Sequence, residues 1–179
     1  AALRRDVAAE TRALLKPMGI AVVLVTHDRH EANAMADRIG VLGSQTQNSR
    51  GSTLLQIDRP EALYRKPSYL EVAKLTGEVN VMKVMVQGER AQSDLGEIDV
   101  SASFEGEAHV IARPEELCFR ATKDGDFEVI KRVYNGGQYE VSARRGEEIF
   151  LIYMAEDETP QIGTLGQVRP QLPLCLVEV

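Results

Sequence analysis

The sequence predicts two parts of different fold class, an α/β segment followed by an all-β domain. In the first part, an apolar run at residues 20–25 stops at polar residues and is followed by helical periodicity, as in a strand that leads into a helix. In the second part, short alternating segments are separated by Asn, Asp and Gly, as in a small barrel or sandwich. Because these patterns change near Gly77, we predict domains at residues 1–76 and 77–179.

Composition excludes several classes of protein and partner. The 179 residues are enough for one full domain or two small ones, and 44% of them are hydrophobic. The formal net charge is -6 without a long Lys/Arg block, so we expect no nucleic-acid partner. The apolar run at 20–25 is far shorter than the roughly 20 residues that span a bilayer, so we expect no direct membrane insertion. Cys118 and Cys175 lack the spacing of a metal site or disulfide scaffold, which predicts buried strand thiols in a reducing compartment.

The chain opens with a predicted helix that ends at residues 16–19, where a Pro and a Gly interrupt the pattern. One face of this helix would carry four apolar side chains, Leu3, Val7, Leu14 and Leu15. Residues 20–25 then predict a buried strand of a parallel sheet, because the run is apolar on both faces. Its carboxyl end presents Thr26, His27 and Asp28, at the position where α/β proteins bind ligands.

A second helix is predicted directly after His27. Four apolar residues fall at i, i+3, i+4 and i+7 and so share one helix face: Ala32, Met35, Ala36 and Ile39. Asp28 is placed to cap this helix, and Glu31 would complete an Asp variant of the capping box.

The rest of the first part predicts two short strands and two short helices. The strands lie at 38–42 and 54–57, on either side of a polar loop at 43–53. The helices lie at 60–64, with Pro60 in the first turn and Asp58 as the cap, and at 69–75.

The segment from Val23 to Ile39 resembles the switch-histidine segment of ABC transporter ATPase subunits. In that family the strand ends in Thr-His-Asp, followed by an acidic residue with Ala and then by Met-Ala-Asp-Arg-Ile. Here the corresponding residues are Thr26 to Asp28, Glu31-Ala32 and Met35 to Ile39. The family histidine reaches the γ-phosphate of ATP, so the resemblance implies that role for His27. Imidazole suits it, because either nitrogen can donate and the group titrates near neutrality.

The resemblance continues through the rest of the first part. Importer ATPases carry a Gln-containing strand, a Pro-Glu helix, a second helix, and then a Gly and an Asn, here Gly77 and Asn80. Two features depart from the family. The loop at 43–53 is longer and more polar than the usual Gly-bearing hairpin, and Asp58-Arg59 replaces Gly-Thr before Pro60.

About eight short strands are predicted in the second part. The residues from Tyr139 to Ala143 alternate between apolar and polar, the period of a strand with one wet face. Asn135-Gly136-Gly137 predicts a tight turn between strands 127–134 and 139–143, and residues 124–126 predict another turn one strand earlier. The other predicted strands are 79–87, 98–103, 108–112, 117–121, 149–154 and 174–179.

The motif Arg113-Pro114-Glu115, with the Gly-Gly turn and residues 163–168, resembles the regulatory β-domain of maltose-, polyamine-, iron- and sulfate-type importers. That domain is built of OB-like strands. The implied fold class is therefore an α/β remnant of a P-loop ATPase domain followed by an all-β OB-like (TOBE) barrel domain. From the residues alone, Arg113 and Glu115 predict a surface ion pair beside a Pro-fixed turn, which we favour over a ligand contact.

The resemblance implies a function for the longer family protein. The chain would be the C-terminal part of an ATP-hydrolysing subunit that powers solute import, with ATP and Mg as cofactors of the full-length parent. The implied partners are a second ATPase subunit, in a homodimer, and the transmembrane permease subunits. Through the permease the protein would lie on the inner, cytoplasmic face of the plasma membrane.

The sequence lacks the motifs that do most of phosphoryl transfer: the phosphate loop with its Lys, the magnesium-holding acid, the general base and the signature loop. The family's Leu-Asp D-loop would fall immediately ahead of Ala1. We therefore expect a carboxyl-terminal fragment that binds no nucleotide and has no ATPase activity alone. We also expect residues 1–76 to pair with a second copy or to be poorly ordered, because the strand at 20–25 would lack its sheet.

Two alternatives come from other functional classes. Four residues, His27, Asp28, His30 and Glu31, could form a metal cluster, but Asp28 would then have to give up the helix cap, so we expect no metal. Alternatively, the second part is a stand-alone β-module that binds a small ligand or a regulator and has no ATPase role.

Overall fold

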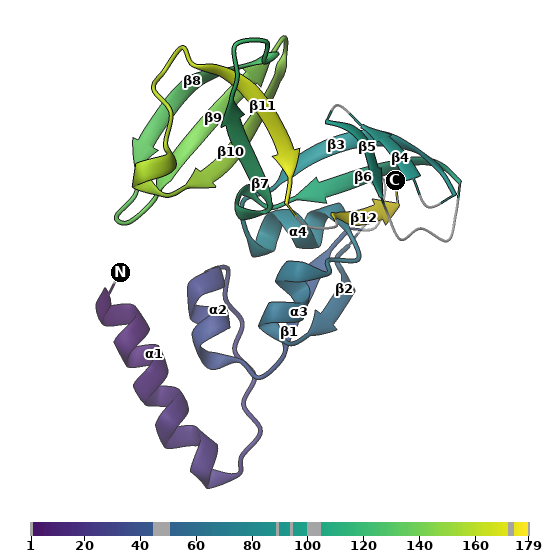
Figure 1. Ribbon diagram of the computed structural model, residues 1–179. Helices are drawn as coiled ribbons and strands as arrows, with labels where there is room; N and C mark the ends of the chain where they lie inside the picture. Colours follow the sequence, from purple (N-terminus) through teal and green to yellow (C-terminus); the bar gives the residue numbers. More distant parts are fainter. Residues whose placement is uncertain are drawn as a thin grey trace. The chain divides into compact units, whose positions relative to one another are not determined.

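The computed structural model of the chain describes residues 2–44, 51–88, 90–93, 95–99, 105–171 and 174–178. They form two compact units, Ala1–Thr76 and Gly77–Val179, which Figure 1 shows in purple to blue and in teal to yellow. The first unit is mainly helical with one strand pair, and the second consists almost entirely of β-strands.

In its described residues, the first unit contains four α-helices and two strands. In chain order these are α1 (Ala2–Leu15), η1 (Lys16–Met18, a 3₁₀ turn), α2 (Arg29–Met35), β1 (Ile39–Gly43), β2 (Thr53–Asp58), α3 (Pro60–Arg65) and α4 (Leu70–Thr76). The opening helix is confirmed, and it ends where Pro17 enters the 3₁₀ turn and Gly19 takes a φ of 65°. Two residues of its expected apolar face are exposed, Val7 by 53% and Leu14 by 73%.

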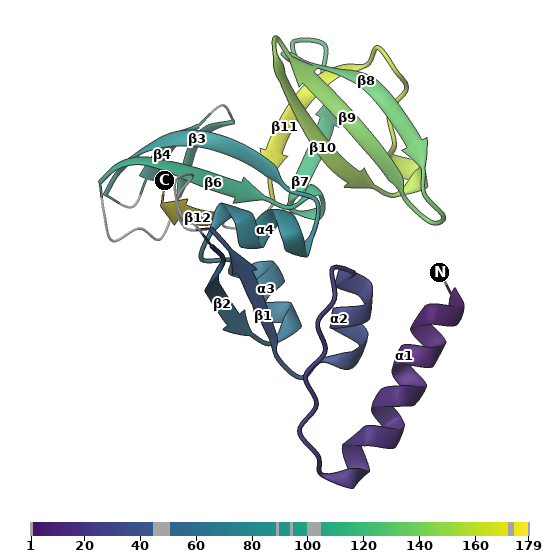
Figure 2. The same ribbon diagram turned by 180° about the vertical axis from the view of Figure 1, so that it is seen from behind.

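The prediction of a strand at residues 20–25 is wrong. This segment runs as an irregular connection between α1 and α2, drawn without an arrow in Figure 2. Val23 and Val25 are each 90% exposed. A strand is defined by a neighbour that accepts and donates its backbone hydrogen bonds, and no described segment of this chain supplies one.

Strands β1 and β2 pair antiparallel, which places the two predicted short strands side by side. Part of the polar loop between them, at 45–50, lies outside the described residues. The hairpin and helices α3 and α4 bury a small apolar cluster: Val41, Leu55, Leu63 and Val72. Gln56 fixes β2 against the connection between the helices, because its amide donates to Lys66 O at 3.1 Å and accepts from Ser68 N at 2.8 Å. The cap predicted at Asp58 is wrong: Arg59 is the N-cap of α3, and Asp58 accepts only from the neighbouring Arg59 N among the described contacts.

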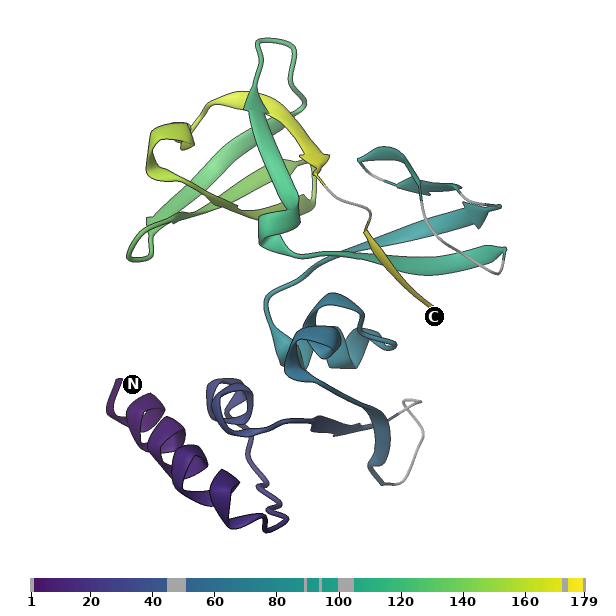
Figure 3. The same ribbon diagram turned by 60° about the horizontal axis from the view of Figure 1, so that its bottom comes forward.

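Among its described residues, the second unit contains two five-stranded antiparallel sheets. Figure 3 shows this unit from another side. The first sheet has the order β12-β6-β3-β4-β5 and the second the order β10-β9-β8-β11-β7. The strands are β3 (Asn80–Gln87), β4 (Arg90–Ser93), β5 (Gly96–Asp99), β6 (Gly106–Ala112), β7 (Leu117–Ala121), β8 (Phe127–Tyr134), β9 (Tyr139–Arg145), β10 (Glu148–Met154), β11 (Leu165–Pro170) and β12 (Cys175–Glu178). Two 3₁₀ turns, η2 (Pro114–Glu116) and η3 (Glu156–Glu158), precede β7 and follow β10.

The structure differs from the predicted barrel in two respects. Strands β4 and β11 were not predicted, and the strand expected at 98–103 corresponds in part to β5, with residues 100–104 outside the described range. Neither sheet of the described part closes on itself through hydrogen-bonded strands, so the expected OB-like closed barrel is not confirmed. The predicted strand positions of Cys118 and Cys175 are confirmed, but both thiols are only partly buried.

A buried amide joins the two sheets. The side chain of Asn80, 6% exposed at the start of β3, donates to Leu151 O at 2.8 Å and accepts from Leu151 N at 2.7 Å. It also donates to Ala112 O at 3.3 Å. Leu151 lies on the edge strand β10, so one side of this strand has no neighbouring strand. The Asn80 amide bonds to both the N–H and the C=O of Leu151, as a neighbouring strand would, and these groups would be costly to bury unpaired.

Arg145 holds the β9–β10 hairpin to the loop before β8. Its guanidinium donates to Asp126 at 2.9 Å and to Glu148 at 3.0 Å, and it stacks 4.5 Å from the centre of the Phe127 ring. Partial burial lowers the pKa of Arg145, but the hydrogen bonds and charges of Asp126 and Glu148 outweigh that effect, so the pKa is raised. The raised pKa favours the charged form of Arg145, which is the form that makes these contacts.

Gly166 is required where β11 passes between its neighbours. A Cβ atom there would collide with Arg120 O and the Phe119 ring, and one at Gly125 would collide with the Gly166 backbone.

We expect Gly166→Ala to lower the free energy of unfolding of the second unit by about 1–3 kcal/mol, the usual cost of overpacking. Urea denaturation measures this loss. The neighbouring Gln167→Ala should change stability by less than about 0.5 kcal/mol, and equal losses in both variants would contradict the steric argument.

Candidate functional site

The predicted site centres on a turn held by the side chains on either side of His27. Thr26 Oγ1 accepts from Asp28 N at 3.0 Å. Asp28 Oδ1 accepts from His30 N at 2.8 Å and from Glu31 N at 3.3 Å, which confirms the predicted cap of α2. Two side-chain contacts thus fix the backbone immediately before and after His27.

The His27 side chain itself is exposed. None of the contacts within the described ranges engages either imidazole nitrogen. The turn therefore fixes where the ring is presented and leaves both nitrogens available to a ligand. An imidazole placed in this way can contact a phosphate oxygen through either nitrogen without first breaking a bond to the protein.

The metal alternative finds no support in this geometry. Asp28 is engaged as the helix cap, and across the residues that the structure describes no group of three or more His, Cys, Asp or Glu side chains could hold a metal ion. His27 and the helix residues His30 and Glu31 are exposed.

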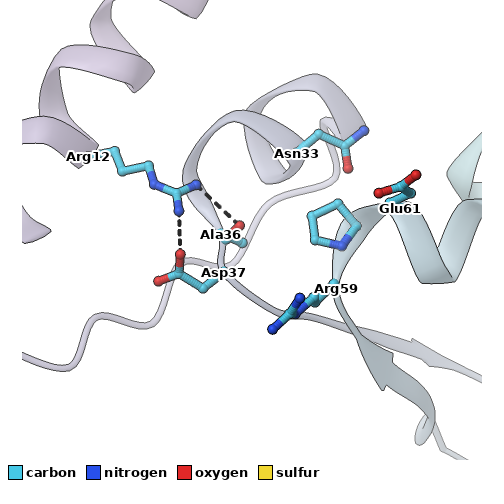
Figure 4. A pocket seen from close by; sticks show the side chains of 7 residues that line it. Arg12, Asn33, Ala36, Asp37, Arg59 and Glu61 are labelled. Carbon is cyan, nitrogen blue, oxygen red and sulfur yellow. Dashed lines mark hydrogen bonds and ion pairs between the residues drawn. The ribbon is translucent and has the colours of Figure 1, made fainter.

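A second polar cluster, which the sequence pattern did not indicate, lies beside α2. Arg12 of α1 pairs with Asp37, and it also donates to Ala36 O at 3.4 Å. Figure 4 shows this pair on one side of a cavity of about 450 Å³, opposite Arg59 and Glu61. Asp37 belongs to the Met-Ala-Asp-Arg-Ile motif, so in this structure the acidic residue of the motif connects the end of α2 to α1. Most of the lining side chains are exposed, as in a solvated groove.

Arg113 is not the surface residue that the sequence predicts. It is 2% exposed, and its guanidinium donates to Glu78 O at 3.1 Å. Its backbone N–H donates to Glu116 Oε2 at 2.7 Å, and together they form a capping box around η2, with Pro114 buried in the first turn. Glu115 is exposed. The expected surface position is thus wrong for Arg113, whose guanidinium instead holds the backbone of Glu78, just before β3.

We expect Asp28→Ala to remove about 1 kcal/mol of local stability from the first turn of α2, the usual cost of losing a side-chain cap. The backbone amides of His30 and Glu31 should then exchange hydrogen about fivefold faster. Hydrogen exchange followed by NMR measures both amides. Asn33→Ala, an exposed change in the same helix, is the control. Unchanged exchange at residues 30 and 31 in Asp28→Ala would contradict the cap's contribution.

No family model matches the chain. Similar sequences are found among curated import proteins. The chain is 35% identical over 113 residues to the Fe(3+) ions import ATP-binding protein FbpC 1 of Rhodococcus jostii, covering 63% of this chain and 30% of that protein. It is 29% identical over 167 residues to the spermidine/putrescine import ATP-binding protein PotA of Bacillus thuringiensis, covering 89% of this chain and 42% of that protein. The chain is thus similar in sequence to ATP-binding proteins of importers.

The similarity to these ATP-binding subunits includes both units of the structure, since the PotA match covers 89% of the chain. The chain spans 30 to 42% of the length of these relatives. No helix in the described ranges combines the length and the apolar character needed to cross a membrane.

Proposed function

We propose that this chain is the C-terminal part of the ATP-hydrolysing subunit of an ABC importer, and that His27 contacts the γ-phosphate of ATP there. The observation that carries the proposal is the match to an import ATP-binding protein over 89% of the chain. The exposed imidazole, presented by the Thr26 and Asp28 contacts, supports the role of His27.

His27 would act by donating a hydrogen bond to a γ-phosphate oxygen. That contact neutralises charge that builds up as the terminal phosphate leaves, and it is lost once the phosphate has gone. ATP and Mg²⁺ supply the phosphoryl group and its main charge neutralisation when bound. The donor set of this chain fits the phosphate through His27, while the motifs for Mg²⁺ and the phosphate loop are absent from the sequence. Most of the ATP site would therefore be formed by other parts of the subunit.

The two units would have different roles in this subunit. Residues 1–76 would complete the ATPase domain, and residues 77–179 would form a regulatory and dimerisation domain with OB-like strands. In that domain the motif Arg113-Pro114-Glu115 would have a structural part, because Arg113 is buried and bonded to the backbone of Glu78.

The expected partners are a second ATPase subunit and the transmembrane permease subunits, which would hold the protein at the inner face of the plasma membrane. The named solutes of the relatives differ, iron for one protein and polyamines for the other. The chain is similar to both proteins. This favours the role that they share, ATP binding for import, over a role in recognising one particular solute.

A chimera tests this proposal. The part of Bacillus thuringiensis PotA that precedes its match to this chain would be joined to residues 1–179. We expect the chimera to hydrolyse ATP, because this chain would supply the missing switch histidine and second domain. Circular dichroism and ATP binding establish that the chimera is folded. A folded chimera that binds ATP but hydrolyses it no faster than its His27→Ala variant would contradict the proposal.

A further inference from the structure

Helix α2, which follows His27, is too short to fix its own direction. It has seven residues, Arg29–Met35, and none of them is buried. Isolated helices shorter than about 12 residues are marginal in water, and the Asp28 cap acts within the first turn of α2 itself. The direction in which α2 points therefore depends on its contacts with other elements of the Ala1–Thr76 unit.

An arginine of α1 holds the carboxyl end of α2. Arg12 donates to Ala36 O at 3.4 Å, and its other terminal nitrogen pairs with the Asp37 carboxylate, as the dashed lines in Figure 4 show. Ala36 is the C-cap of α2, because its N–H donates to Ala32 O. A planar guanidinium that makes two bonds restrains the orientation of its partners as well as their distance. The contact therefore fixes how α2 lies against α1.

Arg38 joins the same end of α2 to the hairpin, since it donates to Ile57 O of β2 at 3.4 Å. The side chains of Arg12 and Asp37 are 31% and 75% exposed. An ion pair with this exposure contributes little to the free energy of unfolding. Its effect is on the orientation of α2, which few other contacts restrain, and we expect that effect to be separable from stability.

His27 lies at the opposite end of α2 and moves with it. Thr26 and Asp28 fix the turn around His27, and Asp28 also bonds to the first amides of α2, those of His30 and Glu31. A helix of seven residues is about 10 Å long, so a tilt of about 10° at one end moves the other end by about 2 Å. A misplacement of about 1 Å can slow a catalysed reaction on the order of 100-fold.

We propose that Arg12 is a positioning residue for His27 and acts through Asp37 and α2. It holds the carboxyl end of α2, and α2 in turn sets where the imidazole is presented. The effect on ATP hydrolysis rests on the proposed function of His27, whereas the effect on the direction of α2 does not.

Residual dipolar couplings measured by NMR on the full chain test the orientation. In the unmodified chain the amides of α1 and α2 should fit one fixed angle between the two helices. In Asp37→Ala the couplings of α2 should no longer fit that angle. The matched control is Arg59→Gln, an exposed side chain that lines the same groove, and it should keep the fit. An unchanged fit in Asp37→Ala would overturn the inference.

ATP hydrolysis by the complete ATP-binding subunit tests the consequence. Arg12→Gln and Asp37→Ala should each lower kcat about tenfold and leave the KM for ATP within about twofold. The double variant should lose no more than either single variant, because both remove one contact. Combined with His27→Ala, Asp37→Ala should cause no further loss, since no imidazole remains to be positioned.

The possible failures are distinguishable. A further loss in the His27→Ala background would show that the pair acts on the fold in general, and would overturn the positioning role. If His27→Ala lowered kcat and Asp37→Ala did not, the positioning role alone would be overturned. If His27→Ala left kcat unchanged, the proposed function would be overturned, and with it the effect of Arg12 on hydrolysis.

Discussion

Replacing His27 by alanine in the complete ATP-binding subunit is expected to lower the rate of ATP hydrolysis on the order of 100- to 1000-fold, the usual cost of removing one positioned donor to a developing charge. ATP affinity should change little, because the proposed contact matters most as charge develops on the terminal phosphate. Steady-state phosphate release and equilibrium ATP binding measure the two effects separately.

His30→Ala is the matched control for this experiment. His30 is also exposed and lies three residues further along, and its contact with Asp28 is made by its backbone N–H, which the substitution leaves in place. We expect His30→Ala to hydrolyse ATP within about twofold of the unmodified protein. Equal loss in the two variants would show that the turn, and not the His27 imidazole, is what hydrolysis needs.

The largest effect on stability is expected from Asn80→Ala. The substitution leaves Leu151 N, Leu151 O and Ala112 O without their side-chain partner at a position that is 6% exposed. Because each buried group left unsatisfied costs about 1–3 kcal/mol, we expect the free energy of unfolding of the second unit to fall by about 3 kcal/mol. Urea denaturation followed by circular dichroism measures this change.

Asn135→Ala tests whether the loss is specific to the buried amide. Asn135 lies in the same unit, and its side chain donates to Glu140 at 2.8 Å in an exposed position. Water can replace that bond, so we expect a loss below about 1 kcal/mol. If Asn80→Ala were no more destabilising than Asn135→Ala, the amide would not be what joins β3 to β10.

Local patterns predicted most of the elements, because their causes lie within a few residues. The cap of α2 follows from Asp28 and the two amides after it, and the end of α1 follows from Pro17 and Gly19. The strands around Asn135 to Gly137 follow from alternation and a turn sequence.

The failures came from interactions distant in sequence. The run at 20–25 has the composition of a strand, but a strand also needs a partner, and the described chain provides none. The burial of Arg113 depends on Glu78, which lies 35 positions away in sequence. Periodicity within a short window carries no information on such contacts.

The exposure of residues 20–25 bears on the proposed function as well. An exposed apolar segment of this kind is typical of a surface that packs against another part of a protein. An ATPase domain formed by other parts of the subunit would supply such a part, and would at the same time bring a phosphate to His27.

ATP hydrolysis by the complete subunit, measured in parallel with hydrolysis by the isolated chain of residues 1–179, tests the central claim most directly. The proposal predicts that the complete subunit releases phosphate from ATP and that the isolated chain releases none above buffer. A complete subunit that neither binds nor hydrolyses ATP, or an isolated chain that turns over ATP at the rate of the complete subunit, would contradict it.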